Sequence, residues 1–121
     1  MRLELDAIAR DRERLRERWS EQGYRGGRSI SQALREGAER WPDVESIYYA
    51  QGRPRRTTNR ELYADGLELA SALRGLGLRA GDVVGVQLPS WYETAVLHQA
   101  IQHVGAVALP IVTSLDRKSV V

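Results

Sequence analysis

The chain has 121 residues, 42% of them hydrophobic and 28% charged, a composition typical of one soluble globular domain. Its 18 Lys and Arg stand against 16 Asp and Glu, and the resulting formal charge of +2 is too small to indicate nucleic-acid binding by itself. The sequence holds no Cys, which excludes disulfides, thiolate zinc sites and Cys nucleophiles and fits a reducing compartment. No apolar run approaches the roughly 20 residues that cross a bilayer. We therefore expect a cytoplasmic protein that binds neither nucleic acid nor membrane.

The amino-terminal segment predicts a charged helix over residues 3–19, followed by a Gly-rich loop at 22–28. Leu5, Ile8, Leu15 and Trp19 recur at helical spacing and form a thin apolar stripe, which Arg12 interrupts. Acidic and basic residues alternate around this stripe, a pattern that favours a solvated helix lying across another surface. A nucleic-acid-binding helix is disfavoured because five acids are interleaved with six arginines between Arg2 and Arg18. Residues 1–28 are expected to form a unit of their own.

A second helix and a hairpin are predicted next. Ser29 or Ser31 is placed to cap a helix that runs through Arg40. The run 46–50 is aromatic and β-branched, and a turn containing Gly and Pro separates it from the short run 55–57. These two runs predict a β-hairpin.

The third predicted helix has clear signals at both ends. Thr58 and Glu61 form a Thr-x-x-Glu capping box, in which each side chain accepts a backbone N–H that the first turn leaves unpaired. Gly77 is placed to end the helix in a left-handed cap. The face expected to be buried consists of Leu62, Gly66, Leu69, Ala70, Leu73 and Leu76.

The carboxyl-terminal part predicts a parallel strand–helix–strand crossover. The run 83–88 is nearly continuous in apolar residues, as expected for a strand covered on both faces. A helix from about Trp91 to Val104 and a second buried strand at 106–112 follow. The helix face expected against the sheet consists of Trp91, Thr94, Leu97, Ile101 and Val104. The predicted class is α/β, with four helices, a short hairpin and one parallel crossover, an incomplete part of a larger sheet domain.

Glycines and histidines suggest binding sites, but each has a simpler structural role. Gly75, Gly77 and Gly81 close a helix and precede a strand, the reverse of the order in a phosphate-binding loop, so turn and cap roles are favoured. His98 and His103 are five residues apart, about 140° around a helix, and cannot chelate one ion from the same face.

Four further residues near the predicted crossover are candidate site residues. Asp82 beside a glycine is expected to stabilise a turn rather than act as a base. Ser90 is expected to cap the fourth helix, with Glu93 at its third position. Trp91 and Tyr92 suit an aromatic pocket but are more often core or rim residues. From residue chemistry alone we assign no catalytic, substrate-binding, cofactor-binding or metal-binding residue.

The order of motifs carries a family resemblance. Residues 57–62 (TTNREL) resemble a TYxEL opening, and 69–84 resemble the pattern LA..L...G+..GD.V. Leu88-Pro89-Ser90 with Glu93 stands where Leu-Pro-Asn and Glu are usual, and residues 100–110 are similar to A....GAV..P. In this order they resemble the start of the adenylate-forming acyl- and aryl-CoA synthetases. Upstream, Gly23-Tyr24 and Trp41-Pro42-Asp43 are similar to the lead-in of the aryl-acid and alicyclic-acid branches.

The resemblance implies a function for a longer chain. Members of the family activate a carboxylic acid with ATP and magnesium, release pyrophosphate, and pass the acyl group to coenzyme A. Their functional motifs lie later than anything within these 121 residues, and the tail 114–121 retains only Arg117 of the expected Arg-x-x-Glu-Leu continuation. The resemblance thus implies that residues 29–121 are the truncated start of the large AMP-binding domain. The chain is expected to be inactive alone and to bind none of ATP, magnesium or coenzyme A itself.

The sequence is compatible with two hypotheses about the function of the chain. In the first it is the ligase piece, whose partner is the remainder of the synthetase. Such a piece is expected to leave the edge of the strand at 106–112 and one face of 83–88 uncovered, and to self-associate through the uncovered sheet edge. In the second it is a free-standing binding or interaction module without catalysis, whose Arg-rich first helix docks on a partner.

Overall fold

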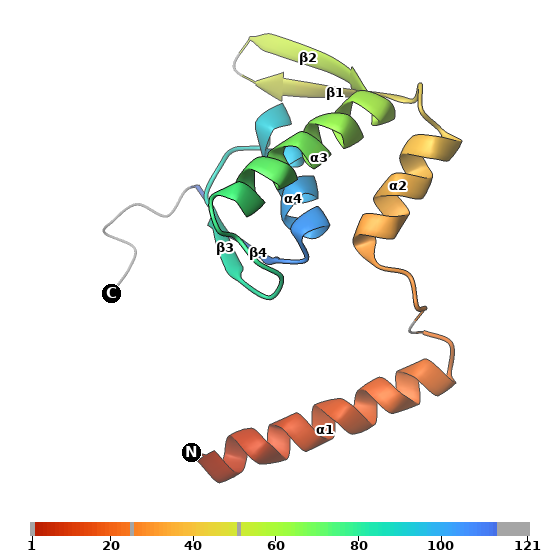
Figure 1. Ribbon diagram of the computed structural model, residues 1–121, viewed down its shortest axis with the longest axis vertical. Coiled ribbons are helices and arrows are strands. Elements are labelled where there is room, and N and C mark those ends of the chain that lie inside the picture. Colours follow the sequence, from red (N-terminus) through yellow and green to blue (C-terminus); the bar gives the residue numbers. More distant parts are fainter. Residues whose placement is uncertain (1, 25, 51, 114–121) are drawn as a thin grey trace.

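The computed structural model describes residues 2–24, 26–50 and 52–113 (Figure 1). In this part of the chain, helices and strands follow one another as α1 (Arg2–Glu21), α2 (Ile30–Arg40), β1 (Glu45–Ala50), β2 (Arg53–Thr58), α3 (Asn59–Gly75), β3 (Val83–Val86), α4 (Tyr92–Val104) and β4 (Val107–Pro110). β1 and β2 form an antiparallel hairpin, and β3 pairs with β4 in parallel. The predicted α/β class, hairpin and parallel crossover are confirmed. The tail 114–121 lies outside the described residues.

Local capping residues begin two of the helices. The Ser29 hydroxyl accepts the backbone N–H of Gln32 at 3.2 Å, while the Gln32 side chain accepts the Ser29 N–H at 2.8 Å. Of the two serines that could cap α2, Ser29 does so. At α3, the Glu61 carboxylate accepts the Thr58 N–H at 2.8 Å and the Thr58 hydroxyl accepts the Glu61 N–H at 3.3 Å. The predicted capping box is therefore confirmed.

The predicted glycine cap after α3 is confirmed, but the predicted buried face of this helix is only partly correct. Gly77 has φ +105°, the left-handed geometry expected of a glycine after a helix. Leu62, Gly66 and Ala70 are buried as predicted. Leu76, in contrast, is 86% exposed, because the helix ends at Gly75 and the chain has already turned away from the core.

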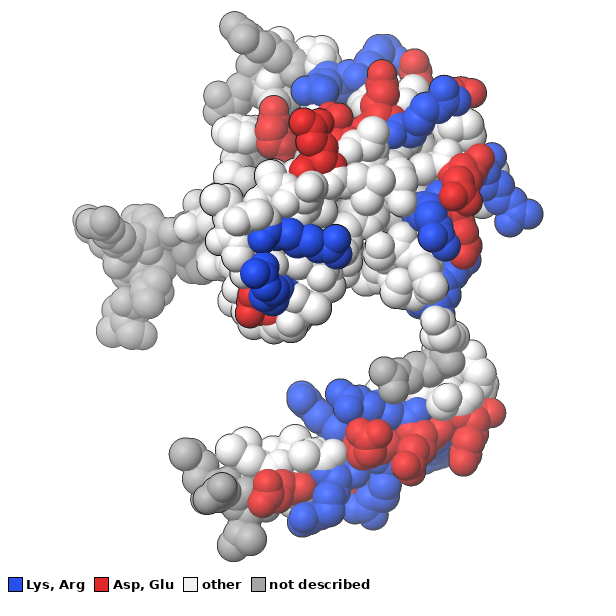
Figure 2. Space-filling view, in the orientation of Figure 1, with Lys and Arg blue, Asp and Glu red and all other residues white. Residues whose placement is uncertain are grey.

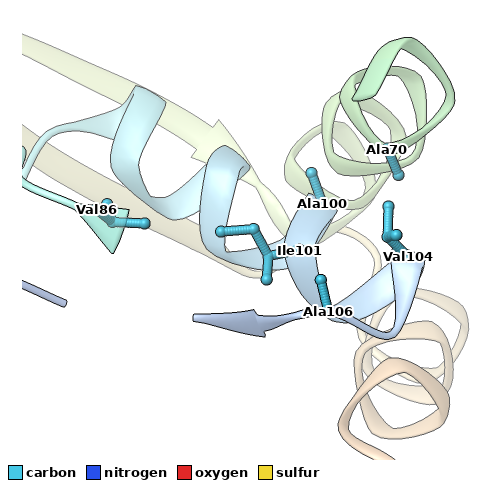
Figure 3. Packing of buried hydrophobic residues seen from close by; sticks show 6 residues of the cluster. All are labelled: Ala70, Val86, Ala100, Ile101, Val104 and Ala106. Atoms are coloured by element: carbon cyan, nitrogen blue, oxygen red, sulfur yellow. The ribbon is translucent and has the colours of Figure 1, made fainter. Parts of the chain in front are cut away.

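The main core lies where α3 and α4 meet the parallel strands (Figure 3). Its buried members are Ala70, Val86, Ala100, Ile101, Val104 and Ala106. Ile101, which is fully buried, lies between the strand residue Val86 and the α3 side of the cluster. Small residues on both helices let α3 approach α4 closely, so α4 is covered by a helix as well as by the sheet.

The face of α4 therefore differs in part from the predicted one. Ile101 and Val104 are buried as expected, whereas Trp91 precedes the helix and is half-buried. The buried residues that periodicity missed are Tyr92, Val96 and Ala100. They were missed because the prediction considered only the sheet, whereas α3 and the hairpin also contact this helix.

The strand at 83–88 is not covered on both faces in the described structure, and the prediction that the ligase piece leaves one of its faces uncovered is confirmed. Val84 packs against the core and Val86 belongs to it, while Val83 on the opposite face is 65% exposed. The same alternation holds in β4, where Ala108 packs inward and Val107 and Leu109 are about half exposed. One apolar face of the parallel pair is thus open to solvent. Among the described helices, none combines the length and apolar character that crossing a bilayer requires.

Candidate functional site

A cleft of about 680 Å³ opens between the hairpin and the start of α4. Its lining combines aromatic and aliphatic side chains with one cation and one carboxylate. We call it the aromatic cleft, and its lining residues are Tyr48, Ala50, Arg55, Leu88, Trp91, Tyr92 and Glu93. The hairpin supplies one wall of the cleft, and the segment leading into α4 supplies the other.

Tyr92 is the central residue of the aromatic cleft. Its ring is buried and meets the Tyr48 ring edge-to-face at 5.7 Å between centroids. The guanidinium of Arg55 stands 3.6 Å from the centroid of the Tyr92 ring, in a cation–π contact. The Tyr92 hydroxyl donates a hydrogen bond to the Asp65 carboxylate, which also lies 3.7 Å from the Arg55 guanidinium. Three elements, β2, α3 and α4, are joined through this one side chain.

The surroundings of Tyr92 keep its phenol protonated. Burial raises the pKa of Tyr92, and the hydrogen bond to Asp65 raises this pKa further. The phenol therefore remains a hydrogen-bond donor throughout the physiological range. A second cleft of about 350 Å³ shares Arg55, Tyr92 and Glu93 with the aromatic cleft and continues along α3 and α4.

The chemistry of the aromatic cleft suits binding. Aromatic walls and one cation favour a planar or apolar group, or a segment of polypeptide, that carries negative charge at one end. The carboxylate of Glu93 is exposed, and the phenol of Tyr92 is engaged with Asp65. The side chains of the aromatic cleft can therefore position a bound group, while the Tyr92 hydroxyl serves a structural contact with Asp65.

A smaller cavity of about 220 Å³ lies between α2, α3 and the end of α4. Here the Ser31 hydroxyl lies 2.7 Å from Nδ1 of His103, and the edge of the Tyr63 ring packs on the imidazole. Arg74 donates to the backbone carbonyl of His103 at 2.8 Å. Burial lowers the pKa of His103, and the nearby Arg74 charge lowers this pKa further. The imidazole is therefore neutral near pH 7, and we assign Nδ1 as the acceptor of the Ser31 proton.

The Ser31–His103 pair acts as a structural tie. Nε2 of His103 is buried and has no hydrogen-bond partner in the described part of the chain, so no group there orients the imidazole as a catalytic base. The contact joins two residues 72 positions apart and fixes α2 to α4.

The turn and cap roles predicted for Gly77 and Gly81 and the turn role predicted for Asp82 are confirmed, whereas Gly75 is the last residue of α3. Gly77 and Gly81 both have positive φ, as their turn and cap roles require. Asp82 accepts the backbone N–H of Arg79 at 2.7 Å, so it stabilises the turn before β3.

The prediction for Ser90 is wrong. The N-cap of α4 is Trp91, and no side chain of the described structure makes a capping bond there. The Thr94 hydroxyl donates to the Pro89 carbonyl at 2.5 Å, and the helix begins at Tyr92, one residue later than predicted.

The aromatic pair Trp91 and Tyr92 fulfils both roles that were weighed. Both line the aromatic cleft, and Tyr92 also belongs to a small buried cluster with Leu62 and Val96. Sequence reasoning missed Arg55 and Asp65, because nothing local to either residue indicates a partner on α4. Among the described residues no group of three or more His, Cys, Asp or Glu comes together that could hold a metal ion.

Comparison with known proteins gives a consistent result. The family model described as "AMP-binding enzyme" matches residues 34–121. The chain is 37% identical over 87 residues to a salicyl-AMP ligase / salicyl-S-ArCP synthetase of Mycobacterium tuberculosis, a match over 70% of this chain and 15% of that protein. It is 38% identical over 94 residues to a 2-hydroxy-7-methoxy-5-methyl-1-naphthoate–CoA ligase of Streptomyces carzinostaticus, covering 78% of this chain and 16% of that one.

Solved structures agree with the sequence matches. The NpsA N-terminal subdomain of Klebsiella oxytoca superposes with a TM-score of 0.67 at 26% identity, covering 74% of this chain and 23% of that one. A structure of the same subdomain with anthranilyl-AMSN gives a TM-score of 0.66 at 26% identity, with 73% and 22% coverage. The chain spans about 15% of the length of the first two curated relatives that it matches.

Proposed function

Because the chain belongs to the AMP-binding enzyme family, we propose that it forms the amino-terminal part of an AMP-forming carboxylic acid–CoA ligase. Such an enzyme transfers the AMP part of ATP to the acid with release of pyrophosphate, and then passes the acyl group to coenzyme A with release of AMP. Residues 29–121 would be the start of its AMP-binding domain, and residues 1–28 a charged extension before it. The match over 34–121 and the confirmed order of helix, strand, helix and strand support this assignment.

We propose an aryl carboxylic acid as the substrate class of the complete enzyme. Two relatives that match at least 70% of the chain are named for a salicyl and a naphthoate substrate. The NpsA subdomain was solved with an anthranilyl ligand.

Within that enzyme, the role of this part is to scaffold the domain and to receive the remainder of the polypeptide. The observation that carries this role is the open apolar face of the parallel strands, on which Val83, Val107 and Leu109 are each more than half exposed. A solvent-facing row of β-branched and aliphatic side chains on a parallel pair is a surface that further polypeptide normally covers. The aromatic cleft is a second surface of this kind, because its walls are apolar and its rim holds a cation.

We assign none of the described residues a direct part in the ATP- and magnesium-dependent step of the family. Adenylation concentrates negative charge on the phosphates and requires a metal and donors aimed at them. The donor set here does not fit a metal, as no carboxylate and imidazole cluster forms within the described ranges. We therefore assign to this part positioning and burial, and no chemical step.

A chimera tests the proposal. The chain replaces the matching amino-terminal segment of the Mycobacterium tuberculosis salicyl-AMP ligase, and salicylate-dependent exchange of pyrophosphate into ATP is measured. We expect exchange by the chimera and none by the 121-residue chain alone. A chimera with Leu109→Asp should lose exchange, because the substitution places a charge on the face to be covered, whereas Glu39→Gln on the exposed side of α2 should not.

Two results would overturn the proposal. One is acid-dependent exchange by the isolated chain, which would place the chemistry within it. The other is a chimera that is folded by circular dichroism yet shows no exchange with salicylate, with other aryl acids or with aliphatic acids.

We also propose that the protein works in the cytoplasm, which the absence of Cys from its sequence supports. Fractionation of cells that express a tagged chain tests this location. Recovery in an extracytoplasmic or membrane fraction would contradict it.

A further inference from the structure

Helix α1 carries an apolar stripe that faces solvent. Leu5, Ile8, Leu15 and Trp19 are 58%, 51%, 42% and 47% exposed, although all four are large apolar side chains. The helix projects away from the other elements (Figure 1), and all its residues from Leu5 to Glu21 are exposed. The proposed enzyme function does not account for this stripe, so its role is a separate question.

The spacing of the stripe is that of a coiled-coil seam. Leu5, Arg12 and Trp19 are seven residues apart and take the a positions of a heptad, while Ile8 and Leu15 take the d positions. At 100° per residue these five positions fall within an arc of about 80°. A stripe this narrow matches a two-helix seam more closely than the broader face that a helix buries in a globular core.

We propose that α1 pairs with α1 of a second copy of this chain as an antiparallel two-helix coil. In the register that places Ile8 against Trp19 of the second copy, Arg12 lies against the partner's Leu15. Its guanidinium can then extend from the seam along an apolar neighbour. A parallel pair in register would place the two Arg12 side chains against each other at the centre of the seam, which is unfavourable.

Charge complementarity identifies the occupant as a second copy in this orientation. Asp11 and Arg18 occupy g positions, which border the seam on one side. In the antiparallel register described above, Asp11 of each copy comes beside Arg18 of the other, so two opposite-charge pairs form. Both residues are exposed, and Figure 2 shows that acidic and basic side chains cover much of α1.

The contacts within one chain leave this pairing accessible. Asp11 accepts a hydrogen bond from Arg14 at 2.8 Å, but both side chains of that pair are more than two-thirds exposed. An exposed pair of this kind is worth at most about 1 kcal/mol, so Asp11 can bind Arg18 of a second copy as well or instead. Arg10 and Glu17 lie at f positions on the opposite side of α1, where they would remain in water.

Charge reversal in the full chain tests the proposal. Sedimentation velocity over a concentration series measures the dimer fraction of the wild type, of Asp11→Arg and of Arg18→Asp. We expect the wild type to dimerise and each single variant to dimerise about tenfold more weakly, because each creates two like-charge pairs. An equimolar mixture of the two variants should recover wild-type association, since both pairs are then of opposite charge.

The f positions of α1, on the side away from the seam, provide matched controls. Glu17→Arg and Arg10→Asp make similar charge changes on the outer side and should leave the dimer unchanged, with circular dichroism confirming equal helicity. A monomer at every concentration would overturn the proposal. Equal dimerisation by all variants would overturn it in favour of the open strands. Weakening by Asp11→Arg but not by Arg18→Asp would overturn the antiparallel arrangement.

Discussion

Gly66 of α3 lies directly against Gln99 of α4: a Cβ added at position 66 would stand 2.9 Å from the Gln99 Cβ and 3.2 Å from its Oε1. The absence of a side chain at this one position lets the two helices approach. Because Ala100 and Ile101, next along α4, are fully buried in the core, α4 cannot easily withdraw. The contact therefore fixes the distance between the helices that carry Asp65 and Tyr92 of the aromatic cleft.

We expect Gly66→Ala to lower the free energy of unfolding by about 1–3 kcal/mol, because the added methyl overpacks the crossing of the two helices. Urea denaturation followed by circular dichroism measures the change. Gly37→Ala in α2 is the matched control, since nothing lies within 4 Å of its added Cβ. The control should be neutral or stabilising by up to about 1 kcal/mol. Equal effects of the two substitutions would show that packing at Gly66 is looser than described.

Thr58→Ala should destabilise the protein by about 1 kcal/mol, since the hydroxyl that accepts the Glu61 N–H is lost. Thr58→Ser keeps the acceptor and should recover most of this loss. Chemical denaturation at neutral pH compares the two variants. A serine variant as unstable as the alanine variant would indicate that the threonine methyl, rather than the cap, matters.

The same cap predicts an acid dependence. Hydrogen bonds from the Thr58 backbone and side chain lower the pKa of Glu61 below 4.5. A carboxyl whose folded pKa is lowered stabilises the fold above the unfolded value, and this contribution is lost as the pH falls through the folded value. Glu61→Gln should therefore reduce the loss of stability below about pH 4.5. Denaturation midpoints measured at neutral and acidic pH provide the comparison, and parallel curves for variant and wild type would refute it.

His103 predicts a second pH dependence in a different range. Burial and the Arg74 charge lower the pKa of His103 from 6.5. Between the folded and the unfolded pKa values, the imidazole is therefore protonated in the unfolded chain but neutral in the folded one. Stability should therefore fall as the pH drops below about 6.5, and the fall should end below the folded pKa. Arg74→Gln should reduce this slope, because it removes one of the two causes. Thermal unfolding across this range tests the effect, and an unchanged slope in the variant would exclude the contribution of Arg74.

The contact of Tyr92 with Asp65 can be measured by a double-mutant cycle. Tyr92→Phe and Asp65→Asn should each cost about 1–2 kcal/mol, and the double variant should cost less than their sum because the two groups bond to each other. Tyr49→Phe is the matched control, because Tyr49 is 77% exposed and should tolerate the loss of its hydroxyl. Additive effects in the cycle would argue against a direct hydrogen bond.

Features that depend on a few neighbouring residues could be predicted from the sequence. The capping box of Thr58 and Glu61 and the turn at Asp82 each involve partners three residues apart, so chain geometry alone brings them together. Where two local arrangements compete, the local pattern does not decide between them. Ser90 satisfies the pattern of an N-cap, yet the N-cap of α4 is Trp91, and the Thr94 hydroxyl bonds the Pro89 carbonyl beside it.

Side chains distant along the chain were placed only by the tertiary structure. Asp65 meets Tyr92 across 27 positions, and Ser31 meets His103 across 72. Neither residue of a pair carries a local signal for the other, since the contact depends on how closely α2 and α3 pack on α4. The sequence alone determined the class, the element order and the family pattern, because these follow from periodicity and short-range capping. Which faces are covered, and which groups line the clefts, depends on the long-range packing of helices whose approach only the folded chain sets.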